Sequence, residues 1–151
     1  MTELKTLLFA TDFSTGAARA CNIAQTLARL SGARLHILHI LTESDAWPLQ
    51  VAQEQASSHE QISESETEMQ QFISRYFPEQ NTDSFKLTHE IVAAHNTAEE
   101  IVHQAELIGA SMILMGTEGR SGMKRFFTGS TAEAVVRTAH VPVLTVREDD
   151  E

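Results

Sequence analysis

The 151-residue sequence contains little cysteine, few large aromatic side chains and little positive charge. Its single cysteine, Cys21, cannot form an internal disulfide, which is typical of a protein from a reducing compartment. One tryptophan and one tyrosine leave little aromatic surface on which nucleic-acid bases could stack. The 21 acidic and 11 basic residues give a net charge of −10 at pH 7. This charge argues against a nucleic acid or an anionic membrane as partner.

Long apolar runs are also missing. None approaches the roughly 20 residues that a transmembrane helix requires. The amino-terminal segment has an early acidic residue, Glu3, and lacks the apolar core of a cleavable signal peptide. We therefore expect a cytoplasmic protein. A length of 151 residues with 42% hydrophobic residues is typical of one globular domain, so we expect a single domain over residues 1–151.

The motifs of several enzyme classes are absent as well. The seven histidines do not show the spacing of a metal site, and neither a GxSxG elbow nor a GxxxxGK[ST] phosphate loop is present. A GxGxxG fingerprint does not follow the first apolar run. The sequence therefore shows no catalytic constellation.

Apolar runs and amphipathic segments alternate along the chain. The apolar runs predict strands at residues 5–10, 34–41, 85–93, 111–115 and 141–146. Helical periodicity predicts helices at residues 16–30, 51–77 (with a break near Ser57 and Ser58), 97–109 and 132–139. Two capping boxes, Thr97 with Glu100 and Ser130 with Glu133, predict where the last two helices begin. This alternation predicts an α/β doubly wound sandwich, which binds ligands at the carboxyl ends of its strands.

The most informative stretch is residues 115–132, which read MGTEGRSGMKRFFTGSTA. It contains four of the seven glycines, and the last of them is followed by a serine and a threonine. Glycine backbones can turn their N–H groups toward an anion, and the amino terminus of a helix adds a partial positive charge. Three basic residues, Arg120, Lys124 and Arg125, lie in the same stretch. The pattern predicts a phosphate-binding loop.

The spacing of this stretch, Gly116-x2-Gly119-x9-Gly129-Ser130, resembles the nucleotide-binding signature of the universal stress protein family, in its ATP-binding branch. The flanking run ILMGTEGRSGMKRFFTGSTAEAVVRTAHVPVLTV resembles the carboxy-terminal third of that family. The start, LLFATDFS, resembles its first strand and loop. The resemblance implies a Rossmann-like, adenine nucleotide alpha hydrolase-like fold, with a five-stranded parallel sheet in the order 3-2-1-4-5.

The resemblance also implies a ligand and the residues that hold it. The ligand is ATP, or ADP or AMP, alone or with magnesium. Ala10 would line the base pocket, Asp12 would contact the nucleotide, and Ile40 would offer its backbone to the adenine. The ribose and phosphates would meet Gly116, Gly119, Arg120, Gly129, Ser130 and Thr131, and Met115 would belong to the same site. The residues by themselves leave two alternatives open: Asp12 can cap the following helix, and the glycine stretch can be a simple strand-to-helix loop.

Three residues depart from the family pattern. Glu118 stands where a histidine or another neutral residue is usual, and a carboxylate there disfavours a polyphosphate unless a divalent cation intervenes. His95 replaces a common glycine, and Ser111 replaces the usual aspartate that opens the fourth strand. These departures bear on which nucleotide binds and how tightly.

The resemblance implies a regulatory stress-response protein with little or no turnover that forms a homodimer through the strand Val141 to Val146. Pro142 suits an edge strand, and a short apolar edge strand favours pairing with another chain. Three alternatives stay open: a slow ATP hydrolase or phosphotransferase, a flavodoxin-like FMN carrier with Trp47 near the ligand, and a stress-induced interaction protein that binds no nucleotide.

Overall fold

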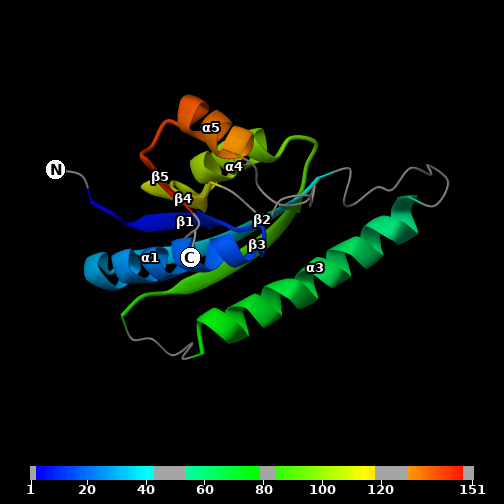
Figure 1. Ribbon diagram of the computed structural model, residues 1–151, viewed down its shortest axis with the longest axis horizontal. Helices are drawn as coiled ribbons and strands as arrows, with labels where there is room; N and C mark the ends of the chain where they lie inside the picture. The colour runs from blue at the N-terminus through cyan, green and yellow to red at the C-terminus, as the bar shows by residue number, and fades with distance from the viewer. Residues whose placement is uncertain (1–2, 43–53, 79–83, 118–128, 148–151) are drawn as a thin grey trace.

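The computed structural model describes residues 3–42, 54–78, 84–117 and 129–147, with only the backbone at residues 15, 54–59 and 129. Five parallel strands form one sheet in the order β3-β2-β1-β4-β5 (Figure 1). The strands are β1 (Thr6–Ala10), β2 (Arg34–Leu41), β3 (Leu87–Ala93), β4 (Met112–Gly116) and β5 (Val143–Val146). The predicted doubly wound fold and its strand order are confirmed.

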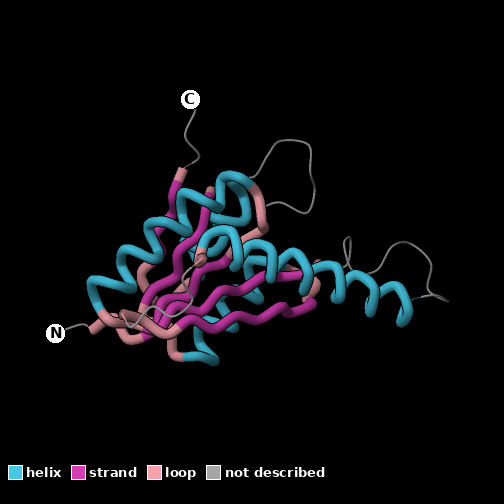
Figure 2. The backbone as a smooth tube through the Cα atoms, turned by 90° about the horizontal axis from the view of Figure 1, so that it is seen from below, coloured by secondary structure: helices cyan, strands magenta, loops and turns pink. Residues whose placement is uncertain are grey.

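Four helices within the described residues cover the two faces of the sheet. They are α1 (Thr15–Ser31), α3 (Glu54–Tyr76), α4 (Thr97–Ile108) and α5 (Gly129–Thr138). The side chains of α1 and α3 share one buried cluster, and those of α4 and α5 share the other, on the opposite face (Figure 1). The amino-terminal end of α3 projects beyond the strands (Figures 1 and 2).

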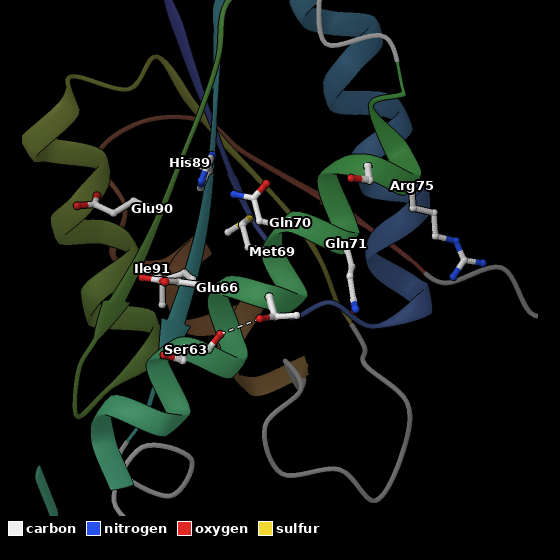
Figure 3. A pocket seen from close by; sticks show the side chains of 11 residues that line it. Ser63, Glu66, Met69, Gln70, Gln71, Arg75, His89, Glu90 and Ile91 are labelled. Carbon is white, nitrogen blue, oxygen red and sulfur yellow. Dashed lines mark hydrogen bonds between the residues drawn. The ribbon is translucent and has the colours of Figure 1, made fainter. Parts of the chain in front are cut away.

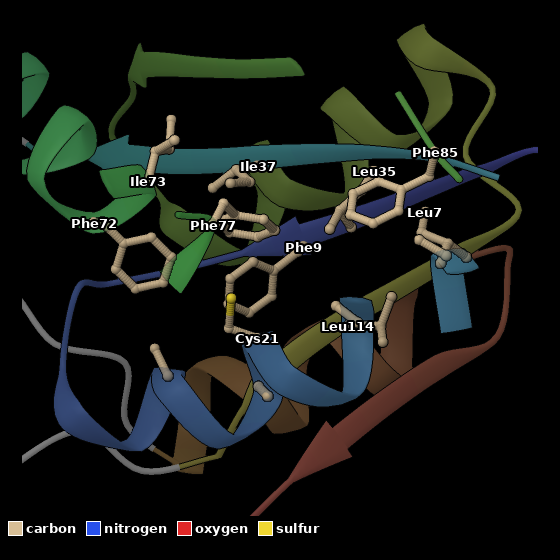
Figure 4. Close-up of a cluster of buried hydrophobic side chains, with 14 of the residues drawn as sticks. Leu7, Phe9, Cys21, Leu35, Ile37, Phe72, Ile73, Phe77, Phe85 and Leu114 are labelled. Atoms are coloured by element: carbon tan, nitrogen blue, oxygen red, sulfur yellow. The ribbon is translucent and has the colours of Figure 1, made fainter. Parts of the chain in front are cut away.

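The cluster under α1 and α3 is rich in aromatic rings, including Phe9, Phe72, Phe77 and Phe85 (Figure 4). Cys21 lies within it, and burial raises the pKa of its thiol to about 12, although a hydrogen bond from Gln25 acts in the opposite direction. A thiol with this pKa stays protonated and unreactive, so Cys21 is a structural residue. The cluster under α4 and α5 contains only aliphatic side chains, methionine and alanine.

Several predicted boundaries are wrong. Asn96 rather than Thr97 caps α4, because the Asn96 side chain accepts a hydrogen bond from the Glu99 backbone N–H at 3.0 Å. Asparagine is at least as good an acceptor at this position as threonine. The helix α5 already includes Gly129, so Ser130 lies inside its first turn and does not precede it.

Three further boundaries differ from the predictions. The predicted break near Ser57 and Ser58 is absent, because α3 is continuous from Glu54 to Tyr76. Both β3 and β5 begin two residues later than predicted, at Leu87 and Val143. The residue just before each strand, Lys86 or Pro142, still accepts a backbone hydrogen bond from the neighbouring strand, so the predicted runs exceed the hydrogen-bonded ladders by little.

No helix within the described residues is both long and apolar enough to span a membrane.

Candidate functional site

The strands β1, β2 and β4 are neighbours, and their carboxyl ends lie at the same end of the sheet. The strand order reverses there, between β1 and β4. Ala10, the last residue of β1, stands opposite Leu38 in β2 and Met115 in β4. Ile40 lies two residues farther along β2. The side chains of Ala10, Ile40 and Met115 are all buried in the cluster under α4 and α5. The structure therefore brings these three predicted site residues together on one face of the sheet.

The loop that follows β1 is held by its own side chains. The Ser14 backbone N–H donates to Oδ1 of Asp12 at 2.9 Å, and the Phe13 N–H donates to Oγ1 of Thr11 at 3.1 Å. Ser14 is the N-cap residue of α1, but its side chain makes no capping hydrogen bond. Asp12 is 3% exposed. The Asp12 carboxylate thus shapes the turn that leads into α1, while its place at the strand end is compatible with a nucleotide contact as well.

Phe13 holds this loop in an unusual conformation. Its φ of +63° lies in the left-handed region, which costs a residue other than glycine of the order of 1 kcal/mol or more. The Phe13 ring stacks on His39, with ring centroids 4.2 Å apart. Nδ1 of His39 lies 2.8 Å from the carbonyl oxygen of Thr11, and because a carbonyl only accepts, Nδ1 carries the proton and donates it. His39 therefore fixes the loop after β1 through this hydrogen bond and through its contact with the Phe13 ring. The sequence did not reveal this role.

The end of β4 is built differently. A Cβ atom added at Gly116 would lie 3.7 Å from the carbonyl oxygen of Gly16 in the first turn of α1 and 3.8 Å from that of Val146. These are ordinary van der Waals distances, so the fold itself tolerates an alanine there. The missing side chain leaves space where β4 faces the amino terminus of α1.

Thr117 follows Gly116 and is the site residue that sequence reasoning missed. Its backbone N–H donates to the carbonyl oxygen of Val146 at 3.1 Å. Its hydroxyl oxygen is buried and has no hydrogen-bond partner within the described part of the chain. A buried hydroxyl without a partner costs about 1–3 kcal/mol, so an acceptor or donor supplied by a ligand would relieve that cost. Its position between Gly116 and Glu118 was the signal available in the sequence.

The amino terminus of α5 completes the part of the site that the structure describes. The first residues of α5 are Gly129, Ser130 and Thr131, of which Ser130 is exposed and Thr131 half-buried. The backbone N–H groups of a first helical turn favour an anion. The predicted contacts Gly119 and Arg120 lie outside the described residues, as do Glu118, Lys124, Arg125 and Trp47.

Two of the three residues that depart from the family pattern, Ser111 and His95, lie within the described residues. Oγ of Ser111 accepts the Lys5 backbone N–H at 3.0 Å and so holds the start of β1 beside β4. His95 is exposed in the turn before α4. No cluster of three or more potential metal ligands occurs among the residues that the structure describes.

The sequence matches the profile of the Universal stress protein family over residues 3–147, so the chain belongs to this family. It is 26% identical to Universal stress protein MJ0577 of Methanocaldococcus jannaschii, over 95% of this chain and 94% of that protein. It is also 49% identical to Universal stress protein MJ0531 of the same organism, although this match covers only 34% of this chain and 30% of that protein.

Solved structures agree with this assignment. The structure of MJ0577 superimposes with a TM-score of 0.77 at 26% identity and covers 98% of this chain and 99% of that one. Two others share the fold at lower identity. A universal stress protein in complex with cAMP has a TM-score of 0.61 at 20% identity, with coverages of 97% and 99%. A universal stress protein from Archaeoglobus fulgidus in complex with dAMP has a TM-score of 0.55 at 18% identity, with the same coverages.

Proposed function

We propose that this universal stress protein binds an adenine nucleotide at the carboxyl ends of β1, β2 and β4. The favoured ligand is ATP, with ADP and AMP as the alternatives, alone or with magnesium. The observation that carries the proposal is the buried hydroxyl of Thr117, which lacks a partner within the described residues and follows Gly116 in the glycine-rich stretch. Two universal stress proteins of the same fold form complexes with adenine nucleotides, which supports this ligand class.

Each part of the nucleotide has a matching group in the proposal. Ala10 and Met115 line the base pocket, and the backbone of Ile40 contacts the adenine. Asp12 contacts the ribose through its carboxylate, whose Oδ1 also accepts the Ser14 N–H. The phosphates contact backbone N–H groups, hydroxyls and the Arg120 side chain. The residues that supply these groups are Gly116, Thr117, Gly119, Arg120, Gly129, Ser130 and Thr131. A few charge-assisted hydrogen bonds of about 1.5–3 kcal/mol each give micromolar affinity once the cost of association is subtracted.

We further propose that nucleotide binding is regulatory, with little or no turnover. The single domain would work in the cytoplasm as a homodimer that pairs through Val141 to Val146. Among the described strands β5 forms one edge of the sheet, and its residues Val143 to Thr145 are partly exposed, which supports pairing there.

The first experiment denatures the freshly purified protein and identifies the released small molecules by mass spectrometry. ATP, ADP or AMP at nearly one molecule per chain supports the proposal. Release of ADP or AMP without ATP would favour the alternative of a slow ATP hydrolase. A Gly116→Val, Gly129→Val double variant should release none.

A calorimetric titration with ATP and magnesium supplies the second readout, with Gly116→Ala as the matched variant whose added methyl group the fold accommodates. If the parent protein releases no nucleotide and shows no binding heat, the proposal of nucleotide binding is wrong. The alternative of an interaction protein that binds no nucleotide is then favoured.

A further inference from the structure

The open edge of the sheet at β3 has a defined hydrogen-bonding pattern. The Leu35 N–H donates to the carbonyl of Lys86 at 2.8 Å, and the Ala94 N–H donates to the carbonyl of Leu41 at 2.8 Å. In a parallel ladder the backbone groups of alternate residues point to the same neighbouring strand. The even-numbered residues 86–94 therefore bond to β2, and the N–H and C=O groups of the odd-numbered residues point to the free edge. This free edge consists of Leu87, His89, Ile91 and Ala93.

A groove runs beside this edge, between β3 and α3, with a volume of about 1000 Å³. The side chains of His89 and Ile91 line it from β3, and those of Ser63, Glu66, Gln70 and Arg75 line it from α3 (Figure 3). His89 and these four α3 side chains are exposed, and Ile91 is half-buried. A sheet edge with free backbone groups beside a helix-walled groove is the geometry in which an extended peptide adds as an extra strand.

The two ends of the groove carry opposite charge. The α3 helix runs antiparallel to β3, so Glu66 lies toward Ile91 while Arg75 lies toward the end of β3 that carries His89 (Figure 3). Exposed Glu60 and Glu64 continue the acidic end along α3. A partner segment that complements this groove has a basic residue at one end and an acidic residue at the other.

We propose that the β3–α3 groove binds an extended segment of a partner protein that pairs antiparallel with β3. In this direction the amino-terminal part of the segment lies near Glu66 and carries the basic residue. The carboxy-terminal part lies near Arg75 and carries the acidic residue. Alternate side chains of the segment point into the groove opposite Ile91, His89 and Leu87. A second copy of β3 fits less well, because its seven residues, LTHEIVA, include no lysine or arginine to face Glu66.

The probe is a pool of fluorescent nine-residue peptides with Lys at position 3, Glu at position 7 and Ser, Thr or Val elsewhere. A second pool exchanges the Lys and the Glu and is otherwise identical. Fluorescence polarisation with the full chain should detect binding of the first pool with a dissociation constant below about 1 mM, and at least about fivefold weaker binding of the second. The nucleotide site is not involved, so the result is independent of the function proposed above.

Two variants separate backbone pairing from side-chain contacts. His89→Pro removes an N–H that points to the free edge and leaves the ladder with β2 intact, whereas His89→Ala keeps that N–H. We expect His89→Pro to weaken peptide binding by about fivefold or more and His89→Ala by less than about twofold. Added peptide should also slow amide hydrogen exchange at Leu87, His89 and Ile91.

Three outcomes overturn the proposal. In the first, neither pool binds. In the second, both pools bind equally and His89→Pro changes nothing, which would place the peptide elsewhere. In the third, the free chain self-associates in a manner that His89→Pro abolishes, so that a second copy occupies the edge.

Discussion

The two edges of the sheet differ in length, charge and surroundings. β3 has seven residues, includes His89 and Glu90 at its surface, and lies beside the groove that α3 forms. β5 has four residues, Val-Leu-Thr-Val, and none of them can ionise. Proteins protect exposed edges with charge or by keeping them short. Charge discourages β3 from pairing with an identical strand, whereas β5 has only its shortness and is therefore the edge better suited to a second copy.

The two edges of one parallel sheet can therefore carry two different kinds of contact. On β5, the Ile113 N–H donates to the carbonyl of Pro142 and the Thr117 N–H to that of Val146, so even-numbered residues face β4. Val143 and Thr145 consequently direct their backbone groups to the free edge. One edge would serve the homodimer and the other a different partner. Proline substitutions can test each edge separately, because proline removes a single known N–H.

The largest effect is expected inside β3. Thr88→Pro removes an N–H that points to β2 and should destabilise the protein by about 3 kcal/mol, since it breaks the ladder and leaves a buried carbonyl unpaired. His89→Pro, one residue away, should cost less than about 1 kcal/mol because its N–H faces the free edge. Urea denaturation measures both. Thr88→Ala corrects for the lost hydrogen bond between Thr88 and His36, and equal costs for the two prolines would show the assigned alternation to be wrong.

The corresponding change on β5 tests the homodimer. Thr145→Pro removes one N–H from each copy at the proposed interface and should weaken the dimer by about 2–3 kcal/mol. Sedimentation equilibrium should then show a monomer where the parent is a dimer. His89→Pro is the matched control and should leave the dimer unchanged. A Thr145→Pro protein that stays dimeric would move the interface away from β5.

A smaller effect should appear at Thr117, which connects β5 to the candidate nucleotide site through its N–H. Thr117→Val replaces the buried hydroxyl, which has no partner among the described residues, by a methyl group and should stabilise the free protein by about 1 kcal/mol. The same change should weaken nucleotide binding by about fivefold, because the hydroxyl contact is lost. Thermal unfolding and calorimetric titration give the two values. If affinity is unchanged, Thr117 does not contact the ligand.

The smallest effect is expected in the pH dependence of stability. It should be larger at β3 than at β5, because His36 contacts β3. His36 holds β3 through Nδ1 to Oγ1 of Thr88 at 2.7 Å, and its Nε2 lies 3.8 Å from Oε1 of Glu90. Burial lowers the pKa of His36 below its usual value near 6.5, and His89 and Arg34 act in the same direction, whereas Glu90 opposes them.

The unfolded chain therefore binds more protons near pH 6.5 than the folded one, so this contribution to stability is present above that pH and is lost as the pH falls through the folded pKa. Urea midpoints at pH 7.5 and 5.5 should fall less for His36→Gln than for the parent. On acidification the protection factors of the β3 amides should fall before those of the β5 amides. An identical pH dependence in the variant would exclude His36 as the cause.

Much of the fold was predictable because it depends on local patterns. Burial on both faces makes β1, β2 and β4 largely apolar. Apolar runs predicted all five strands, although the edge strand β3 has His89 and Glu90 at its surface. The strand order came from the family resemblance, since periodicity does not record which strand lies beside which. Cap positions such as Asn96 were missed because two neighbouring polar residues each offered a suitable acceptor.

The candidate site was predictable in part. Ala10, Ile40 and Met115 were identified through the resemblance, and the structure brings them together on one face of the sheet. Thr117 and His39 were missed because their roles depend on atoms far away in the sequence. The Thr117 hydroxyl is buried and finds no partner in the part of the chain that the structure describes, and His39 reaches the Thr11 carbonyl across 28 residues.

Apolar periodicity and glycine spacing are local properties of the chain, and they are enough to establish the class of fold and the glycine-rich segment. Which backbone groups stay free at the two edges follows only from the folded arrangement, because it depends on the register between neighbouring strands. The folded arrangement also places α3 beside β3 and leaves a groove with charged ends. Such features arise from packing between distant segments, and no short stretch of sequence specifies them.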